Sequence, residues 1–383
     1  MSKRIKKSRK IHLGRSELDR GSCNSEDYDT ARVYWKKRLS GEKLINTKQD
    51  NNCQFAIVVP VYNERVDRIS KQIKSIKNQT RLSSDEFEII YIVNNGIADN
   101  PKAIKIQKNN ISVINYIRSL KEKNIHVIDK SSCGNEIASC NVGRARNRGV
   151  AEASYRFWQR GVNGWIVQID ADSYIEDKNY FKKLKSIISR DRYIIGVACG
   201  CLFEFNPDTQ DRRKRKTLRQ KTKLLLLQKC WIRLIQFIQN PDNPLFKREK
   251  RFHGVNMISR SYESAAIGGL IDKNSREDAV FGLSLEEYAC CHNRKVIGAK
   301  NKLIVTSSIR ESDRTLVSYG YDYAKIDLKK PLVVDSPFSI KPEKIPLTEK
   351  NYKKLSNLVC QVPGGNEVVR YYKKQLNTVR YLE

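Results

Sequence analysis

Short apolar runs rich in β-branched residues alternate with segments of helical periodicity between residues 54 and 175. This alternation predicts strands joined by helices, and therefore an α/β fold whose mostly parallel sheet carries helices on both faces. The periodicity is clearest in residues 64–79, where Val66 and three isoleucines recur every three or four positions. We expect Pro60 to end the first strand, because proline donates no ladder hydrogen bond. The predicted strands cover residues 55–59, 87–93, 125–129 and 164–169, and a further helix covers residues 141–161.

Two aspartates, Asp170 and Asp172 in "QIDADSYI", directly follow the last of these strands. In an open parallel sheet, ligands bind at the edge where the strands end. Paired carboxylates at that edge indicate a cation with oxygen ligands, Mg²⁺ or Mn²⁺. The alternative is a solvated turn followed by a helix cap.

The first strand is followed by "PVYNE" and not by a glycine-rich turn of the Gly-x-Gly-x-x-Gly type. The phosphate-binding signature of dinucleotide enzymes is therefore missing where it should stand, which argues against a nicotinamide dehydrogenase. The chain also lacks the Gly-x-x-x-x-Gly-Lys-[Ser/Thr] loop that is typical of ATPases.

The composition points to an intracellular protein with polyanionic partners. Among 383 residues, 73 Lys and Arg face 42 Asp and Glu, a formal charge of +31, which favours nucleic acid, anionic lipid or phosphorylated substrates. The 10 cysteines include no Cys-x-x-Cys pair and the chain has only 4 histidines, so neither a zinc framework nor a redox motif is indicated. The basic N-terminus lacks the apolar core of a signal peptide, and no apolar run is long enough to span a bilayer. A cytoplasmic location is expected, with peripheral attachment to the inner membrane face left open.

Five segments are predicted from changes in composition. Residues 1–50 read as a flexible basic tail with one short helix near residues 28–39, and residues 206–251 as a basic amphipathic insert. Within the insert, residues 211–223 hold eight basic residues and one acid, and an apolar stripe follows at Leu224, Leu227, Trp231, Leu234, Ile235 and Ile238. This segment either lies on an anionic membrane or is an ordinary amphipathic helix packed on the enzyme core with a solvated basic flank, and we favour the second interpretation. The remaining segments are residues 51–205, 252–328 and 329–383.

Four segments, "FAIVVPVYNE", "EIIYIVNNG", "NVGRARNRGVAEA" and "WIVQIDADSYI", stand in the order and spacing of a known family. They resemble the nucleotide-sugar half of family 2 glycosyltransferases of the GT-A fold. Downstream, residues 253–270 are similar to the acceptor-side strand and helix of that family, and residues 276–288 to its Glu-Asp motif. The resemblance covers about residues 54–315 and implies a GT-A-type, Rossmann-like mixed sheet.

The resemblance implies a metal-dependent transfer of a sugar from a nucleotide diphosphate. Asp172 would hold Mn²⁺ or Mg²⁺, with Asp170 near the metal or the ribose, to stabilise the charge that builds up on the leaving diphosphate. The other donor-binding residues implied by the resemblance are Pro60, Tyr62, Asn63, Glu64, Asn94, Arg146, Asn147, Arg310 and Arg314.

The resemblance also implies that Asp278 is the general base that activates the acceptor hydroxyl, with inversion of the anomeric centre. By position alone, a carboxylate there is a cap at a helix N-terminus. Glu277 and Asn256 would lie on the acceptor side, and the acceptor would be a saccharide, a lipid-linked hydroxyl or a small molecule. The alternative from another class is a basic nucleic-acid-binding or scaffold protein that keeps the fold without catalysis. No nucleic acid partner is expected, because the basic residues are not interleaved with aromatic ones.

Overall fold

The computed structural model describes residues 25–136, 141–205, 212–241, 252–273, 277–309, 333–338, 343–377 and 379–381. The chain divides into two compact units. The first contains Met1–Cys201 and Lys250–Val305, and the second contains Leu202–Glu249 and Thr306–Glu383.

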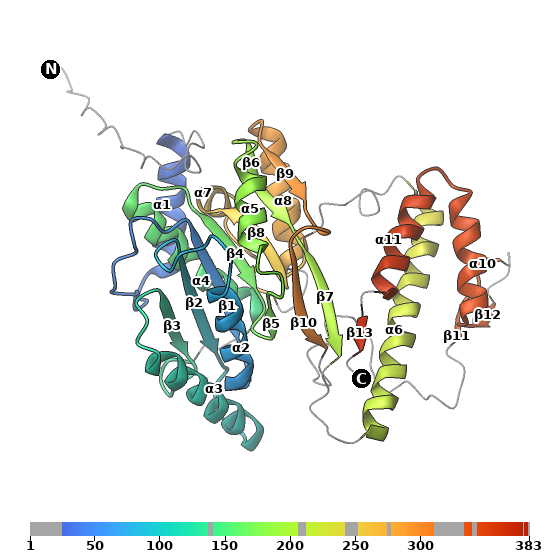
Figure 1. Cartoon of the computed structure of the whole chain (residues 1–383), viewed down its shortest axis with the longest axis horizontal. Coiled ribbons are helices and arrows are strands. Elements are labelled where there is room, and N and C mark those ends of the chain that lie inside the picture. The colour runs from blue at the N-terminus through green and yellow to red at the C-terminus, as the bar shows by residue number, and fades with distance from the viewer. Residues whose placement is uncertain are drawn as a thin grey trace. The chain divides into compact units, whose positions relative to one another are not determined.

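A seven-stranded sheet in the order β3-β2-β1-β4-β8-β6-β9 forms the centre of the first unit (Figure 1). Strands β3, β2, β1 and β4 run parallel, β8 is antiparallel to β4 and β6, and β6 is parallel to β9. The mostly parallel α/β sheet predicted from the sequence is therefore confirmed. The strands are β1 (Phe55–Val61), β2 (Phe87–Asn94), β3 (Ile125–Lys130), β4 (Trp165–Ile169), β6 (Ile194–Ala198), β8 (Asn256–Arg260) and β9 (Lys295–Gly298).

Strand β1 continues through Pro60, where the sequence predicted its end. β1 pairs with β4 only over residues 55–58, whereas its pairing with β2 continues to Val61. Proline is tolerated at position 60 because the ladder towards β4 has already ended there.

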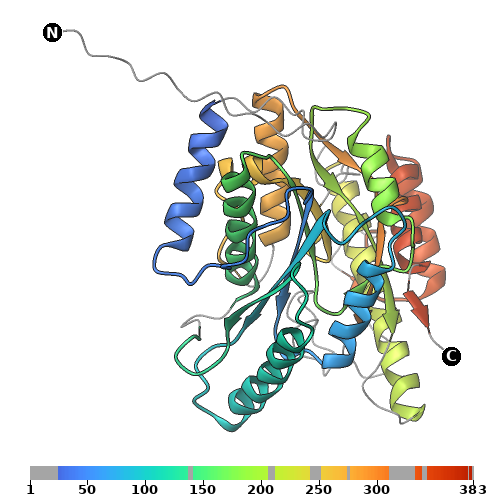
Figure 2. The ribbon, with the colours of Figure 1, turned by 60° about the vertical axis from the view of Figure 1, so that its left-hand side comes forward.

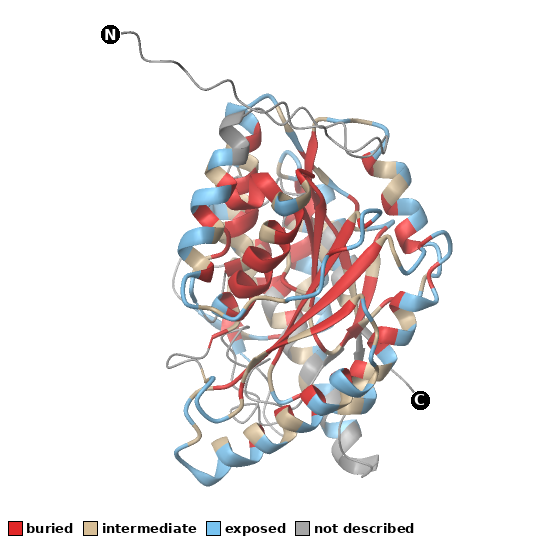
Figure 3. Cartoon of the chain, turned by 90° about the vertical axis from the view of Figure 1, so that its left-hand side faces the viewer, coloured by how far each residue is buried: buried red, intermediate tan, exposed pale blue. Residues whose placement is uncertain are grey.

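The two faces of the sheet bury separate apolar clusters, and alternate residues of each strand point to opposite faces. Phe55, Ile57 and Val59 pack with α2 (Val66–Lys77), α3 (Pro101–Ser119) and α5 (Tyr180–Ile188). Ala56 and Val58 pack with α4 (Val142–Arg160), α7 (Ser261–Ala266) and α8 (Glu277–Cys291). The central strands are accordingly buried on both faces (Figure 3).

The N-terminal helix α1 (Ser25–Leu39) packs against α4 and α7 (Figure 2). Ala31 and Tyr34 are buried there. The short helix predicted near residues 28–39 is therefore present, whereas residues 25–50 are packed on the first unit and not a flexible tail. The last turn of α1 contains the basic residues Lys36, Lys37 and Arg38, so the composition of the segment does not indicate its short apolar face. Residues 1–24 lie outside the described part of the chain.

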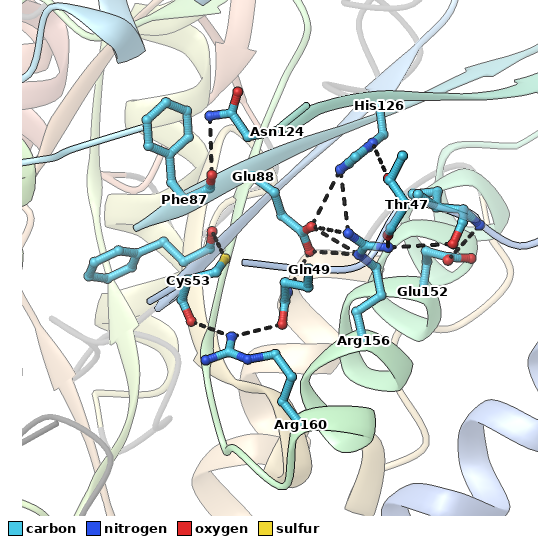
Figure 4. A network of polar contacts seen from close by, with 12 residues as sticks. Thr47, Gln49, Cys53, Phe87, Glu88, Asn124, His126, Glu152, Arg156 and Arg160 are labelled. Carbon is cyan, nitrogen blue, oxygen red and sulfur yellow. Dashed lines mark hydrogen bonds and ion pairs between the residues drawn. The ribbon is translucent and has the colours of Figure 1, made fainter. Parts of the chain in front are cut away.

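A buried polar network binds the segment between α1 and β1 to α4 (Figure 4). At its centre, Arg156 of α4 donates to Glu88 of β2, with an Nη2–Oε2 distance of 2.8 Å, and both side chains are 3% exposed. The Arg156 Nη1 group also donates to the Thr47 carbonyl at 2.7 Å, and His126 Nε2 lies 3.5 Å from Glu88 Oε2. This network fixes residues 42–53 on the surface of α4.

The second unit has a core of its own, made by α6 (Arg212–Gln239), α10 (Glu349–Cys360) and α11 (Gly365–Asn377). Leu227, Trp231 and Leu234 of α6 are buried against Leu355 and Val359 of α10. The apolar stripe is therefore packed inside the protein, as favoured, but its partner is the C-terminal segment and not the core of the first unit. The predicted basic insert and C-terminal extension thus belong to a single unit.

The strands of the second unit are short. Strands β13, β7 and β10 are neighbours in that order, and β11 pairs with β12 in an antiparallel hairpin. The bounds of these strands are β7 (Gly200–Phe205), β10 (Ile304–Ile309), β11 (Val333–Asp335), β12 (Lys344–Pro346) and β13 (Val379–Tyr381).

No helix in the described part of the chain is long and apolar enough to cross a membrane.

Candidate active site at the carboxyl edge of the sheet

Asp170 and Asp172 lie in the turn between β4 and the two-residue strand β5 (Ser173–Tyr174). Gln72 of α2 holds this turn, because its Nε2 group donates to the carbonyls of Asp170 and Ser173 at 2.8 and 2.7 Å. The Asp170 side chain is 32% exposed, and Asp172 is of intermediate burial. Both carboxylates therefore stand at the strand end where the sequence predicted them.

Arg146 of α4 lies beneath this turn with its side chain only 2% exposed. Its Nη2 group donates to Asp170 Oδ1, and its Nε atom lies 3.6 Å from Glu277 Oε1. A Cβ atom on Gly254 would stand 2.9 Å from the same Nη2 atom, so the chain before β8 passes closely over the guanidinium. The direct diphosphate contact inferred from the resemblance does not match this arrangement, because Arg146 is buried and paired with two carboxylates.

Glu277 and Asp278 open α8 beside this guanidinium. Asp278 Oδ2 accepts the N–H of Gly254 at 2.7 Å, and Oδ1 accepts the N–H of Ala279 at 2.7 Å. Burial raises the pKa of Glu277 above its ordinary value, Arg146 opposes this effect, and the nearby charges of Asp278 and Asp170 add to it. Three carboxylates and one guanidinium thus form a single electrostatic cluster, which we call the acidic cluster: Asp170, Glu277, Asp278 and Arg146.

The ends of β1, β2 and β3 are tied together by Asn110, a fully buried residue of α3. Its Oδ1 atom accepts the N–H of Asn63 at 2.8 Å, and its Nδ2 group donates to the Asn94 carbonyl and to Ser131 Oγ. Asn63 adopts a left-handed conformation, with φ of 54°, directly after β1. The sequence analysis missed Asn110, although a polar residue among the apolar positions of a helix was a readable signal.

The other predicted donor residues at these strand ends are close to the same edge. Pro60 is buried within β1, Tyr62 is of intermediate burial, and Glu64 is 1% exposed and lies 3.9 Å from Arg68 Nη1. Asn94 donates from Nδ2 to the Val61 carbonyl at 2.8 Å. Strand order therefore brings the end of β1 next to that of β2 on one side and that of β4 on the other.

Two residues assigned to ligands from the resemblance make structural hydrogen bonds instead. The Asn147 amide donates to Asp272 Oδ1 at 2.9 Å and to the Leu270 carbonyl, and its Oδ1 atom accepts the Leu270 N–H at 2.8 Å. The buried Asn256 accepts from the Tyr180 hydroxyl at 2.7 Å and donates to the Gly200 carbonyl at 3.0 Å. In this structure both amides therefore connect segments of the protein that are distant in the sequence.

The predicted metal ligands fit a divalent cation in part. Asp170 and Asp172 supply carboxylate oxygens, which suit Mg²⁺ and Mn²⁺. One oxygen of Asp170 is held by Arg146. Among the described residues, no group of three or more His, Cys, Asp or Glu side chains could hold a metal. A cation here would therefore need ligands from the substrate or water. Arg310 and Arg314 lie outside the described residues.

Comparison with known proteins gives one family match. The model of the family described as "Glycosyl transferase family 2" matches residues 56–252. No curated protein sequence matches the chain. The matched segment includes Arg146, Asp170 and Asp172 and ends before Glu277.

Several solved structures are similar at low identity. A mannosyltransferase from Pyrobaculum calidifontis in complex with GDP-Man and Mn²⁺ is 12% identical, with a TM-score of 0.40, over 93% of this chain and 85% of that one. TarS 1–349 from S. aureus is 15% identical, with a TM-score of 0.38, over 67% and 60% of the two chains. Glucosyl-3-phosphoglycerate synthase from Mycobacterium tuberculosis, in complex with phosphoglyceric acid, is 11% identical, with a TM-score of 0.36, over 82% and 90%.

Proposed function

The chain belongs to glycosyltransferase family 2 and is a glycosyltransferase, and from this premise we propose that it moves a sugar from a nucleotide diphosphate to a hydroxyl group. The reaction is metal-dependent and inverts the anomeric centre. The acceptor hydroxyl belongs to a saccharide, a lipid-linked molecule or a small molecule.

The observation that carries this proposal is the position of Arg146 between two parts of the chain. One buried guanidinium contacts Asp170 at the end of β4 and Glu277 at the start of α8. A transferase must hold its donor and its acceptor within bonding distance of each other. A shared counter-ion between the donor strand and the proposed acceptor helix supports such an arrangement.

On the donor side, Asp172 would hold Mn²⁺ or Mg²⁺ together with Asp170. Such ions commonly bind through one or two carboxylates plus substrate phosphates and water. When bound, the ion would compensate the negative charge that builds up on the departing diphosphate. The chain itself orients the two carboxylates, because Gln72 fixes the turn and Arg146 holds one oxygen of Asp170.

On the acceptor side, Asp278 is the proposed general base. Its two oxygens accept one backbone N–H each, which fixes the carboxylate, and each oxygen keeps a further lone pair for the acceptor proton. The acceptor oxygen forms the new bond to the anomeric carbon as the bond to the diphosphate breaks, and its proton passes to Asp278. This single displacement inverts the anomeric centre. Glu277 is the weaker candidate for the base, because it is buried against Arg146.

The strand-end residues Tyr62, Asn63, Glu64 and Asn94 are proposed to contact the nucleobase and ribose. Their place next to the β4 turn supports this, since the strands that carry them are neighbours in the sheet. Arg310 and Arg314 are proposed to close over the diphosphate. A peripheral contact with an anionic membrane is a further proposal, motivated by the basic residues 212–223.

A panel of nucleotide sugars tests this function by thermal denaturation with and without Mn²⁺. A ligand that binds the native state raises the melting temperature by mass action. We expect one donor to raise it only when Mn²⁺ is present, and Asp172→Asn to remove that dependence while the variant without ligand melts as the parent does. If no nucleotide sugar raises the melting temperature, the proposed donor class is wrong, and stabilisation by a DNA or RNA oligonucleotide instead would favour the alternative of a basic binding protein that keeps the family fold without this reaction.

A further inference from the structure

We infer that the N-terminal helix α1 is a positioning element of the reaction centre, through Tyr34 and Arg38. The proposal rests on the proposed function, because it concerns the placement of the proposed base Asp278. Helix α1 lies outside the segment that matches the family, which begins at residue 56.

Helix α1 directly contacts the turn that follows α7. Arg38 Nη1 lies 3.3 and 3.4 Å from the two carboxylate oxygens of Asp272. The Tyr34 hydroxyl donates to Asn147 Oδ1 of α4 at 3.3 Å, and both residues are buried. Tyr34 and Arg38, one helical turn apart in α1, therefore contact α4 and the turn after α7 respectively.

Asn147 joins these contacts into one network. Its Nδ2 group donates to Asp272 Oδ1 at 2.9 Å and to the Leu270 carbonyl, while Oδ1 accepts the Leu270 N–H at 2.8 Å. The preceding residue of α4 is Arg146, which contacts Glu277. Consecutive residues of α4 thus hold the turn before α8 and the first residue of α8.

The turn packs too tightly to shift as a free loop. Gly269 has a φ of +72°, and a Cβ atom there would overlap the Tyr34 hydroxyl and Asn147 Oδ1. A Cβ atom on Gly143 would overlap the Ile271 carbonyl, and the Gly143 N–H donates to the Lys273 carbonyl at 3.1 Å. Glycines at these two positions let the turn approach α1 and α4 closely enough for the contacts above.

Helix α1 is itself fixed, because the segment that follows it is bound along α4. Arg148 Nε lies 3.3 Å from Glu42 Oε2, Glu152 accepts the Ile45 N–H at 3.0 Å, and Arg160 donates to the Cys53 carbonyl at 2.7 Å. Arg148 and Glu152 are spaced at i and i+4 and share one face of α4, and Arg160 extends the contacts to the last turn of the helix. The bound segment fixes α1 relative to α4, and α1 in turn holds the turn at Asp272 through Arg38.

The consequence for catalysis is selective. Loss of the Arg38 or Tyr34 contact loosens the turn and the first turn of α8, which carries Asp278. The turn that carries Asp172 is held separately by Gln72, which donates to the carbonyls of Asp170 and Ser173, so donor and metal binding should stay unchanged. Turnover should therefore fall while the KM for the donor is retained.

Hydrogen–deuterium exchange of the full chain tests the placement without any substrate. Arg38→Gln and Tyr34→Phe should raise exchange about tenfold in peptides that cover residues 265–273 and 277–285. Arg32→Gln is the matched control, since it removes the same charge from an exposed position of the same helix. Arg38→Lys, which keeps the charge, should restore part of the protection.

A kinetic comparison follows once a donor and an acceptor are identified. Arg38→Gln and Tyr34→Phe should lower kcat roughly tenfold with an unchanged donor KM, because small misplacements of a reacting group are costly. Unchanged exchange over residues 265–285 in both variants would overturn the inference, as would an equal loss in the Arg32→Gln control. These outcomes say nothing about whether the chain transfers sugar, so failure of the proposed function is recognised separately.

Discussion

At the scale of single residues, Asp278 separates catalysis from helix capping. It stands in the first turn of α8, where a carboxylate also stabilises the helix terminus; its Oδ1 atom accepts the N–H of the next residue, Ala279, and its Oδ2 atom accepts the N–H of Gly254. Helix stabilisation and proton abstraction use the same carboxylate oxygens, but an asparagine at position 278 could perform only the first. Asparagine caps nearly as well as aspartate and accepts no proton at neutral pH.

Asp278→Asn is therefore expected to lower turnover by roughly a hundredfold to ten-thousandfold with little change in donor affinity. Melting temperature is measured on the same variant. Asp67→Asn, in the first turn of α2, is a matched control that should keep both activity and stability. Full turnover by Asp278→Asn would remove the proposed base and the argument for direct inversion.

Glu277 gives the acidic cluster a pH dependence. Burial raises the pKa of Glu277 above its ordinary value of 4.5, so the folded state binds its proton more tightly than the unfolded state does. The resulting stabilisation is complete below the ordinary pKa and is lost as the pH rises through the folded pKa.

The free energy of unfolding of the parent, relative to that of Glu277→Gln, should therefore decrease as the pH rises from the ordinary pKa of about 4.5 towards neutrality. Each unit by which the pKa is raised corresponds to about 1.4 kcal/mol. Urea unfolding of both proteins across this range measures the difference. A difference independent of pH would mean that Arg146 fully compensates the Glu277 charge.

The sequence placed Asp170 and Asp172 correctly because a strand end needs only local periodicity to be found. It did not reveal the structural hydrogen bonds of Asn147 and Asn256, whose partners Leu270 and Gly200 are distant in the sequence. Asn110 shows the same limit from the other side, since its position among apolar residues was visible but its three strand-end partners were not. The chemistry of a side chain can be read locally, whereas its hydrogen-bond partners are set by the fold.

At the scale of secondary-structure elements, α4 links the sheet, the segment 42–53 and the acidic cluster. It begins with Asn141, which caps the helix through a bond from the Arg144 N–H, and ends at Gly161 in a left-handed conformation. These end signals are local, and the sequence predicted the helix almost to its limits. The short helix near residues 28–39 was predicted, but the packing of residues 25–53 on α4 was not, because their anchors are charged residues of α4 that become buried only when the segment covers them.

Arg156→Gln is expected to destabilise the first unit by about 3–5 kcal/mol, because Glu88 would remain buried without its guanidinium partner. Arg118→Gln is the control. Its ion pair with Asp129 is more than half exposed on the arginine side, and such pairs contribute little. Urea unfolding of both variants measures the contrast. Equal stability of the two variants would show that His126 and Gln49 compensate Glu88 without Arg156.

At the scale of the whole molecule, each of the two units has its own core. The sequence treated residues 206–251 and 329–383 as separate additions, since neither carries a chemical motif. The structure joins them because the apolar stripe of α6 needs a partner, and α10 and α11 supply it. The stripe is thus used within the chain, and only charge remains to attract an anionic surface.

The last prediction concerns that charge, in residues 212–223, which hold eight Lys and Arg and no acidic residue. Among them, Lys216 is exposed, whereas Lys223 is paired with Glu349 at 2.9 Å. Because Trp231 and Leu234 are packed inside the second unit, membrane binding would be electrostatic, worth about 1 kcal/mol per basic residue near the surface.

We expect the protein to sediment with phosphatidylserine vesicles at low salt, to be released at high salt as ions screen the charges, and not to bind phosphatidylcholine. Neutralising Lys214, Lys216 and Lys221 to Gln should weaken sedimentation, while the same number of changes at the exposed Lys102, Lys105 and Lys108 of α3 serves as the control. Partition that resists salt would mean that the apolar stripe leaves its core and inserts, and absence of binding at low salt would mean that this charge serves only solvation.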